Sequence, residues 1–223
     1  MTSIAIIIFS PHKTKFETLT EKINKNYCKK NNYDYFTFNK CPVLMENKYY
    51  NWCSYYYVLE LLQKQEKKYD YVLYIDSNSF FCDHNKRIEQ WIISDKNIYI
   101  GLDTTFKYIL RKNNPTKVKT NVTIFKNSDW TVQFLNFILT DLIHKPYWKI
   151  KNGYETAFRR CLFYNSFSIK ENICFIKNFN FNNYNGDLKK YIKNGGWVLS
   201  LTNSQDENYN ENLAKQFIKI NKL

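Results

Sequence analysis

The feature that most constrains the fold is a regular alternation of short apolar segments with longer amphipathic ones. Residues 3–9 (SIAIIIF) form an apolar run typical of a fully buried strand, and residues 14–31 place apolar side chains at helical spacing. Residues 33–39 alternate like a second strand, residues 50–67 form a second amphipathic helix, and residues 71–75 return to the sheet. Strands alternating with helices favour a mainly parallel sheet with right-handed crossovers.

The rest of the chain continues this α/β pattern. Further helices are expected at 87–93, 130–143 and 154–163, and further strands at 97–102, 121–126, 173–176 and 197–202. Residues 107–120 are basic, polar and interrupted by proline, which favours an exposed loop. We find no internal repeat and no linker, and 223 residues are enough for one sizeable core. The sequence therefore predicts one domain over residues 1–223, with helices flanking a mainly parallel central sheet.

Cysteine usage and apolar segments bear on the compartment. The six cysteines form no CxxC pair and no Cys/His cluster, which argues against zinc and a small disulfide scaffold and predicts buried free thiols. The first apolar run is short, lacks a basic region before it, and reads as a strand rather than a signal peptide. No run approaches the roughly 18 residues of a membrane span. We therefore expect a soluble, cytoplasmic protein with no transmembrane segment.

The charge balance narrows the choice of partners. The chain carries 33 Lys and Arg against 20 Asp and Glu, a formal net charge of +13, which favours phosphate-bearing or other polyanionic ligands. The lysines are spread singly along the chain, so a solvated basic surface without a partner fits the charge equally well. A nucleic-acid-binding protein that stacks bases on its many Tyr and Phe rings would fit this composition. However, the aromatic residues fall at core spacing in strands and helices, and no RNA-recognition or zinc-knuckle signature is present. We therefore expect no nucleic-acid partner.

Polar residues follow the apolar strand of the segment YDYVLYIDSNSFF, where Asp76, Ser77 and Asn78 come directly after residues 71–75. Ser10 stands in the same place after the first strand. Ligands of open α/β sheets bind outside the carboxyl ends of the strands, so these residues are expected to line one crevice. An aspartate at such a place can instead cap the following turn. Two acids at positions i and i+2 could both reach a hard cation, but here the second position is an amide.

Several segments resemble a known enzyme family. NKNYCKKNNYDYFTF resembles its helix-to-strand passage, NWCSYYYVLELLQKQEKKYDYVLYIDSNSFF its Trp-centred helix and the strand ending in a DxD motif, and NVTIFKNSDWTVQFLNFIL its Asn-x-Gly strand and Trp-bearing helix. NGYETAFRR and GGWVLSL resemble its Glu-Gln helix start and its late strand with a histidine. The family is that of GT-A-fold nucleotide-sugar glycosyltransferases, nearest to the fungal α-mannosyl/galactosyltransferases and plant xyloglucan xylosyltransferases.

The resemblance implies a set of site residues. The donor would be bound by Ser10, Asp76, Ser77, Asn78 and Asn121, a metal by Asp76, Asn78 and Ser200, and catalysis would involve Glu155 and Asp103. Asn78 replaces the second acid of DxD and Ser200 replaces the histidine, which weakens the expected Mn²⁺ or Mg²⁺ site. A lysine from residues 107–119 could take over part of the cation's work, because a leaving diphosphate needs a cationic partner.

Two functions remain open at this point. The first is a glycosyltransferase that moves a hexose or pentose from a UDP- or GDP-linked donor to a glycan or protein acceptor. Its stereochemistry stays undecided, because Glu155 could equally serve as the base of an inverting enzyme. The second is a catalytically degenerate transferase fold that binds a nucleotide or glycan without turnover, favoured by the loss of one acid and one histidine.

Overall fold

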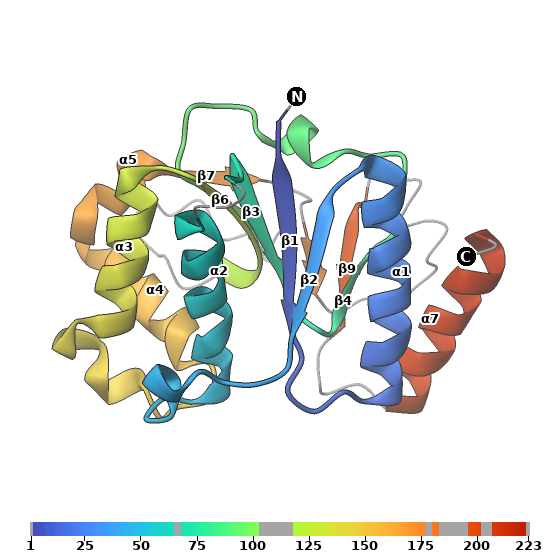
Figure 1. The fold of residues 1–223 in the computed structure, drawn as a ribbon, viewed down its shortest axis with the longest axis horizontal. Helices are drawn as coiled ribbons and strands as arrows, with labels where there is room; N and C mark the ends of the chain where they lie inside the picture. The colour runs from blue at the N-terminus through green and yellow to red at the C-terminus, as the bar shows by residue number, and fades with distance from the viewer. Residues whose placement is uncertain are drawn as a thin grey trace.

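The structure is a computed structural model, and it describes residues 2–64, 68–102, 118–176, 180–182, 196–201 and 207–221. It has a central six-stranded sheet and a smaller three-stranded sheet, with helices on both faces of the central sheet (Figure 1). No helix among these residues is both long and apolar enough to cross a membrane.

The central sheet has the strand order β2-β1-β3-β6-β5-β7. β1 lies parallel to both β2 and β3, and β5 lies parallel to β7, whereas β6 runs antiparallel to its neighbours β3 and β5. The predicted mainly parallel sheet is therefore confirmed, with one reversed strand inside it. The strands are β1 Ile4–Phe9, β2 Asp34–Phe38, β3 Tyr71–Ile75, β5 Ile98–Leu102, β6 Val118–Lys126 and β7 Ile173–Ile176.

Helices cover both faces of this sheet. Among the described residues, the α-helices are α1 Lys15–Asn31, α2 Cys53–Gln63, α3 Asp129–Thr140, α4 Gly153–Tyr164, α5 Ile169–Asn172 and α7 Glu207–Asn221. Figure 1 shows α2, α3 and α4 on one side of β1, and α1 with α7 on the other. The small sheet lies on the α1 side and consists of β4 Ser79–Phe81, β9 Val198–Ser200 and β8 Asn180–Asn182.

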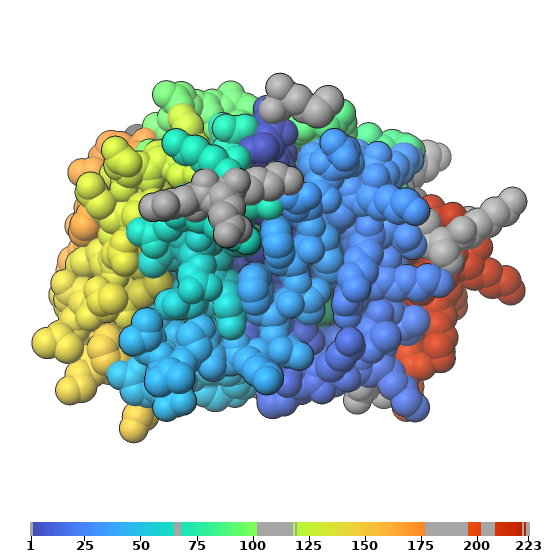
Figure 2. All heavy atoms as spheres, in the orientation of Figure 1, coloured from blue at the N-terminus to red at the C-terminus, as the bar shows by residue number. Residues whose placement is uncertain are grey.

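Alternate side chains of β1 enter two separate cores, as the period of a buried strand requires. Ala5, Ile7 and Phe9 pack against α2, α3 and α4. Ile4, Ile6 and Ile8 pack on the opposite face. Burial on both faces explains why this strand is a continuous apolar run. Figure 2 shows side chains of α1, β2 and α2 meeting over the central strands that the ribbon view leaves open.

Three expected helices differ from the observed ones. The expected helix 50–67 begins as a 3₁₀ turn, η2 Tyr50–Trp52, and the expected helix 87–93 is only a 3₁₀ turn, η3 Ile88–Trp91. The expected helix 130–143 ends at Thr140, because Asp141 has an extended backbone and its Oδ1 accepts from the Ile143 N–H at 2.9 Å. The other 3₁₀ helices that the structure describes are η1 Val43–Met45, η4 Leu142–Tyr147 and η5 Ser166–Ser168.

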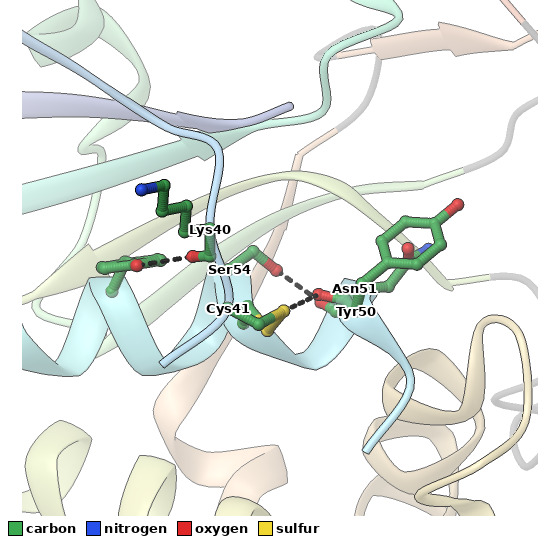
Figure 3. The surroundings of a disulfide bond; sticks show 7 residues. Lys40, Cys41, Tyr50, Asn51 and Ser54 are labelled. Atoms are coloured by element: carbon green, nitrogen blue, oxygen red, sulfur yellow. Dashed lines mark hydrogen bonds between the residues drawn. A yellow bond between two sulfur atoms is a disulfide. The ribbon is translucent and has the colours of Figure 1, made fainter. Parts of the chain in front are cut away.

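The expectation of free thiols is wrong for one pair of cysteines. Cys41 and Cys53 form a disulfide, which ties the segment after β2 to the first residue of α2 (Figure 3). The four other cysteines are free, and three of them are buried: Cys28, Cys82 and Cys161. The disulfide closes the segment that carries η1 and η2, so it fixes where η2 lies against the rest of the domain.

Candidate functional site

A cavity of about 520 Å³ opens at the carboxyl ends of β1 and β3. The turn after β3, with Asp76, Ser77 and Asn78, lies at its base beside Asn121 of β6. One wall comes from the start of α1, from Leu201 just after β9, and from Asn210 of α7. The other wall comes from η2 and the start of α4. The crevice predicted at this edge of the sheet is therefore present.

The turn that carries Asp76 and Asn78 is held from several directions. The Asp76 N–H donates to the Asn121 carbonyl at 2.8 Å, and the Leu201 N–H donates to the Asn78 carbonyl at 3.0 Å. From α1, the Thr20 hydroxyl donates to the Ser77 carbonyl at 2.9 Å and the Asn24 amide to the Ser79 carbonyl at 3.0 Å. These hydrogen bonds fix the backbone of the turn, so the positions of its side chains at the cavity are set before any ligand binds.

The Asp76 carboxyl group sits in an unfavourable electrostatic setting. Its pKa is raised from 3.8 to about 6, chiefly by burial and to a smaller extent by the nearby carboxylates of Glu17 and Glu155. A hydrogen bond from the Ser77 N–H to Oδ1, at 3.0 Å, partly opposes this rise in pKa. Because the charged form of Asp76 is disfavoured here, a cation that approaches the carboxylate stabilises it.

The α1 wall begins with a capping box. Thr14 and Glu17 bond reciprocally, with the Thr14 N–H donating to Glu17 Oε2 at 2.8 Å and the Glu17 N–H donating to Thr14 Oγ1 at 3.2 Å. Both residues line the cavity. The box therefore stabilises the helix and also fixes a carboxylate at the cavity wall.

The α4 wall depends on a close backbone approach. A Cβ on Gly153, the first residue of α4, would lie 1.9 Å from the Tyr147 carbonyl oxygen, so only glycine fits there. Asn152 precedes it with a left-handed φ of 61°. Glu155, in the first turn of α4, forms an ion pair with Arg159 one turn later. Tyr154 and Lys151 line the same wall.

The η2 segment supplies an aromatic and an amide to the cavity. Tyr50 and Asn51 both line it, and His12 packs edge-on against the Tyr50 ring at 5.3 Å between ring centroids. The Asn51 amide donates to Asn152 Oδ1 at 3.4 Å, which links η2 to the start of α4. Figure 3 shows Tyr50 and Asn51 directly beside the Cys41 end of the disulfide, so that bond holds this wall in place.

The structure brings together most of the residues predicted from sequence. Asp76, Ser77, Asn78, Asn121 and Glu155 all line the one cavity. Asn121 was expected to open a strand but lies inside β6; because β6 is antiparallel, its first half reaches the carboxyl edge of β3.

Two predicted residues, Ser10 and Ser200, are not among the lining residues, and a third is outside the part of the chain that the structure describes. Ser10 is buried beside the cavity, with its Oγ lacking a hydrogen-bond partner in the described part of the chain, but it is not among the lining residues. Ser200 Oγ lies 2.6 Å from Ser79 Oγ, away from that lining. Asp103, like most of the basic segment 107–119, lies outside the described residues.

The donor set for a metal ion is small. Among the described residues, no three His, Cys, Asp or Glu side chains are arranged to hold a metal ion. Asp76 and Asn78 at the cavity base can still offer a carboxylate and an amide oxygen. Mg²⁺ is commonly held by one or two carboxylates together with substrate phosphates and water, so these residues fit a cation that arrives with a diphosphate.

Sequence reasoning missed several lining residues, including His12, Glu17, Tyr50, Lys151 and Asn210. Glu17 carried a capping-box signal, Thr-x-x-Glu, that points to a helix start at the cavity edge but not to a ligand. Lys151 stands just before the expected helix 154–163, and its place near a helix start was the one sequence feature that could have drawn attention to it. No local pattern marked His12 or Tyr50.

Comparisons with known proteins agree on the fold. No protein-family model matches the chain, and no curated protein matches it by sequence. Among solved structures, a glycosyltransferase involved in glycosylation of the major capsid of PBCV-1 matches with a TM-score of 0.68 and 11% identity, over 96% of this chain and 99% of that one. The galactosyltransferase LgtC, in complex with donor and acceptor sugar analogues, matches with a TM-score of 0.58 and 11% identity, over 97% and 94%.

A third similar structure is the glycosyltransferase GlyE of Streptococcus pneumoniae TIGR4, with a TM-score of 0.59 and 12% identity. It is matched over 97% of this chain but only 60% of its own length. At such low identities the likeness establishes the fold alone. The chain shares the GT-A fold of these structures, which the resemblance of its sequence segments implied.

Proposed function

We propose that the chain is a glycosyltransferase that moves a hexose or pentose from a UDP- or GDP-linked sugar to a glycan or protein acceptor. The observation that carries the proposal is the position of Asp76 and Asn78 at the base of a preformed cavity, at the carboxyl end of β3 in a GT-A fold. The finer resemblance, to fungal α-mannosyl/galactosyltransferases and plant xylosyltransferases, stays a prediction.

The proposed donor places its diphosphate over the turn 76–78. Mn²⁺ or Mg²⁺, held by Asp76 and Asn78, would neutralise charge that develops on the leaving diphosphate. Lys151 lines the same cavity and supplies a protein cation for that charge. A contribution from a lysine of residues 107–119 stays a prediction.

Glu155 and Asn121 are proposed to face the transferred sugar. Both line the cavity, and the ion pair with Arg159 orients the Glu155 carboxylate. In an inverting reaction Glu155 would accept the proton of the acceptor hydroxyl as general base. In a retaining reaction it would instead lie beside the positive charge that develops on the sugar. Asp103 stays a second catalytic prediction, outside the described residues.

A binding module without turnover is the alternative. It is favoured by the contact between Ser200 and Ser79, which turns the Ser200 hydroxyl toward a neighbouring strand, and by the single carboxylate of the DxD-like turn. Such a module would bind the donor or a glycan in the same cavity. The two functions differ in whether the donor is consumed.

Calorimetric titration of UDP-glucose, UDP-galactose, UDP-xylose and GDP-mannose, with and without Mn²⁺, tests the proposal. We expect one nucleotide class to bind, more tightly with Mn²⁺, and Asp76→Ala to remove that gain. Asp141→Ala, which changes an exposed aspartate outside the cavity lining, is the matched control. A folded wild-type sample that binds none of these donors contradicts the proposal. Donor hydrolysis or transfer that disappears in Asp76→Ala excludes the binding module.

A further inference from the structure

Asn210, on the C-terminal helix α7, places an unsatisfied polar group at the cavity. The residue is only 6% exposed, and it belongs to the cavity lining. Its Oδ1 accepts no hydrogen bond from any residue in the described part of the chain. A buried acceptor without a partner destabilises the fold, so its presence at a ligand cavity indicates a ligand that donates to it.

The position of Asn210 on α7 explains how it reaches the cavity. Leu213, Ala214 and Phe217 pack with Phe16 of α1 in one buried cluster. Asn210 precedes them at helical spacing, so it continues the buried stripe of α7 by one turn. An apolar residue would be expected in such a stripe. The chain has an amide there, at the end where the apolar cluster gives way to the cavity.

The two walls of the cavity would face different halves of the donor. Figure 1 shows α1 and α7 on one side of β1 and α4 on the other. If the diphosphate lies over the turn 76–78 and the sugar lies against Asn121 and Glu155, the nucleoside extends toward α1 and α7. We infer that Asn210 accepts a hydrogen bond from the nucleoside of the donor, through a ribose hydroxyl or a base N–H. This inference rests on the proposed function.

The test compares nucleotide fragments on matched variants. Wild type, Asn210→Leu and Asn210→Ala are titrated with UMP, UDP and pyrophosphate, or with GMP and GDP if guanine nucleotides bind. Asn212→Ala, an exposed asparagine two residues along α7, is the control. We expect both Asn210 variants to lose about five- to tenfold in affinity for the mono- and the diphosphate alike, as for one hydrogen bond. Pyrophosphate affinity and the Asn212→Ala variant should not change.

The ligand-free melting temperature provides a second readout. Because Asn210→Leu removes an unpaired buried acceptor, its Tm should equal or exceed that of wild type even as nucleotide affinity falls. A fall in Tm together with a loss of pyrophosphate affinity would show a structural role and overturn the inference. Unchanged affinity for the nucleoside monophosphate would also overturn it. Wild-type protein that binds neither UDP nor GDP removes the proposed function as well, whereas normal binding by both Asn210 variants removes only the role of Asn210.

Discussion

The raised pKa of Asp76 predicts that Asp76→Asn stabilises the ligand-free protein at neutral pH. In the folded protein the Asp76 carboxyl group keeps its proton up to a pH of about 6, whereas an ordinary aspartate loses its proton near pH 3.8. Between these two values the folded state binds more protons than the unfolded state, so stability falls as pH rises through this window. Asparagine resembles the protonated acid and keeps an Oδ1 that accepts from the Ser77 N–H.

The size of the effect follows from the same two values. At about 1.36 kcal/mol for each pH unit, the interval from 3.8 to about 6 amounts to about 3 kcal/mol of unfolding free energy. Asp76 lines the cavity and as a residue is only partly buried, so solvent reduces this figure. We expect Asp76→Asn to gain about 1–2 kcal/mol over wild type above pH 7, and almost nothing at pH 4.

Urea unfolding followed by tryptophan fluorescence, at five pH values from 4 to 8, measures this difference directly. Asp141→Asn is the matched control, because its Oδ1 also accepts one local backbone N–H but its side chain is exposed. The control should show no gain that grows with pH. A difference between Asp76→Asn and wild type that stays constant with pH, or a loss of stability at pH 7.5, would refute the electrostatic account of this site.

Three further predictions follow from the same structure. Gly153→Ala should lower the unfolding free energy by about 2 kcal/mol in urea, because its Cβ would meet the Tyr147 carbonyl, whereas Thr156→Ala on the exposed side of α4 should change it little. Replacing both Cys41 and Cys53 by serine should cost about 3 kcal/mol by loop closure over 12 residues, and unreduced wild type unfolded in urea should titrate with four thiols rather than six. Glu155→Gln should slow sugar transfer at least about 100-fold while leaving UDP affinity nearly unchanged; equal losses in both would place Glu155 in nucleotide binding instead.

Local periodicity predicted the fold well because most elements carry their own signal. The strand expected at residues 3–9 is β1 Ile4–Phe9, and the helix expected at 14–31 is α1 Lys15–Asn31. The reversed direction of β6 was not predictable, because strand direction depends on the path of the whole chain rather than on the residues of the strand. The disulfide was missed for the same reason, since Cys41 and Cys53 meet only through the course of the intervening segment.

The site was predictable where polar residues directly follow a buried strand. Asp76 and Asn78 could be found this way, because the end of a strand is defined locally and strand ends share an edge. Asn210 could not, since nothing near it in sequence says that this part of α7 meets the start of α1.

The predicted cytoplasmic location stays a prediction. The disulfide counts against it, because reducing compartments keep most such pairs as thiols.

Under the proposed function, the charges around the cavity favour entry of the donor together with a cation. Glu17, Asp76 and Glu155 line it, and Lys151 is the one lysine or arginine among the lining residues that the structure describes. A diphosphate alone would add negative charge to this set, whereas a divalent cation balances the diphosphate. The burial that raises the pKa of Asp76 in the ligand-free protein also means that a nearby cation lowers that pKa strongly. In the proposed complex, binding of donor and cation should therefore recover the stability that wild type loses at neutral pH, and Asp76→Asn should be more stable without ligand but weaker in donor binding.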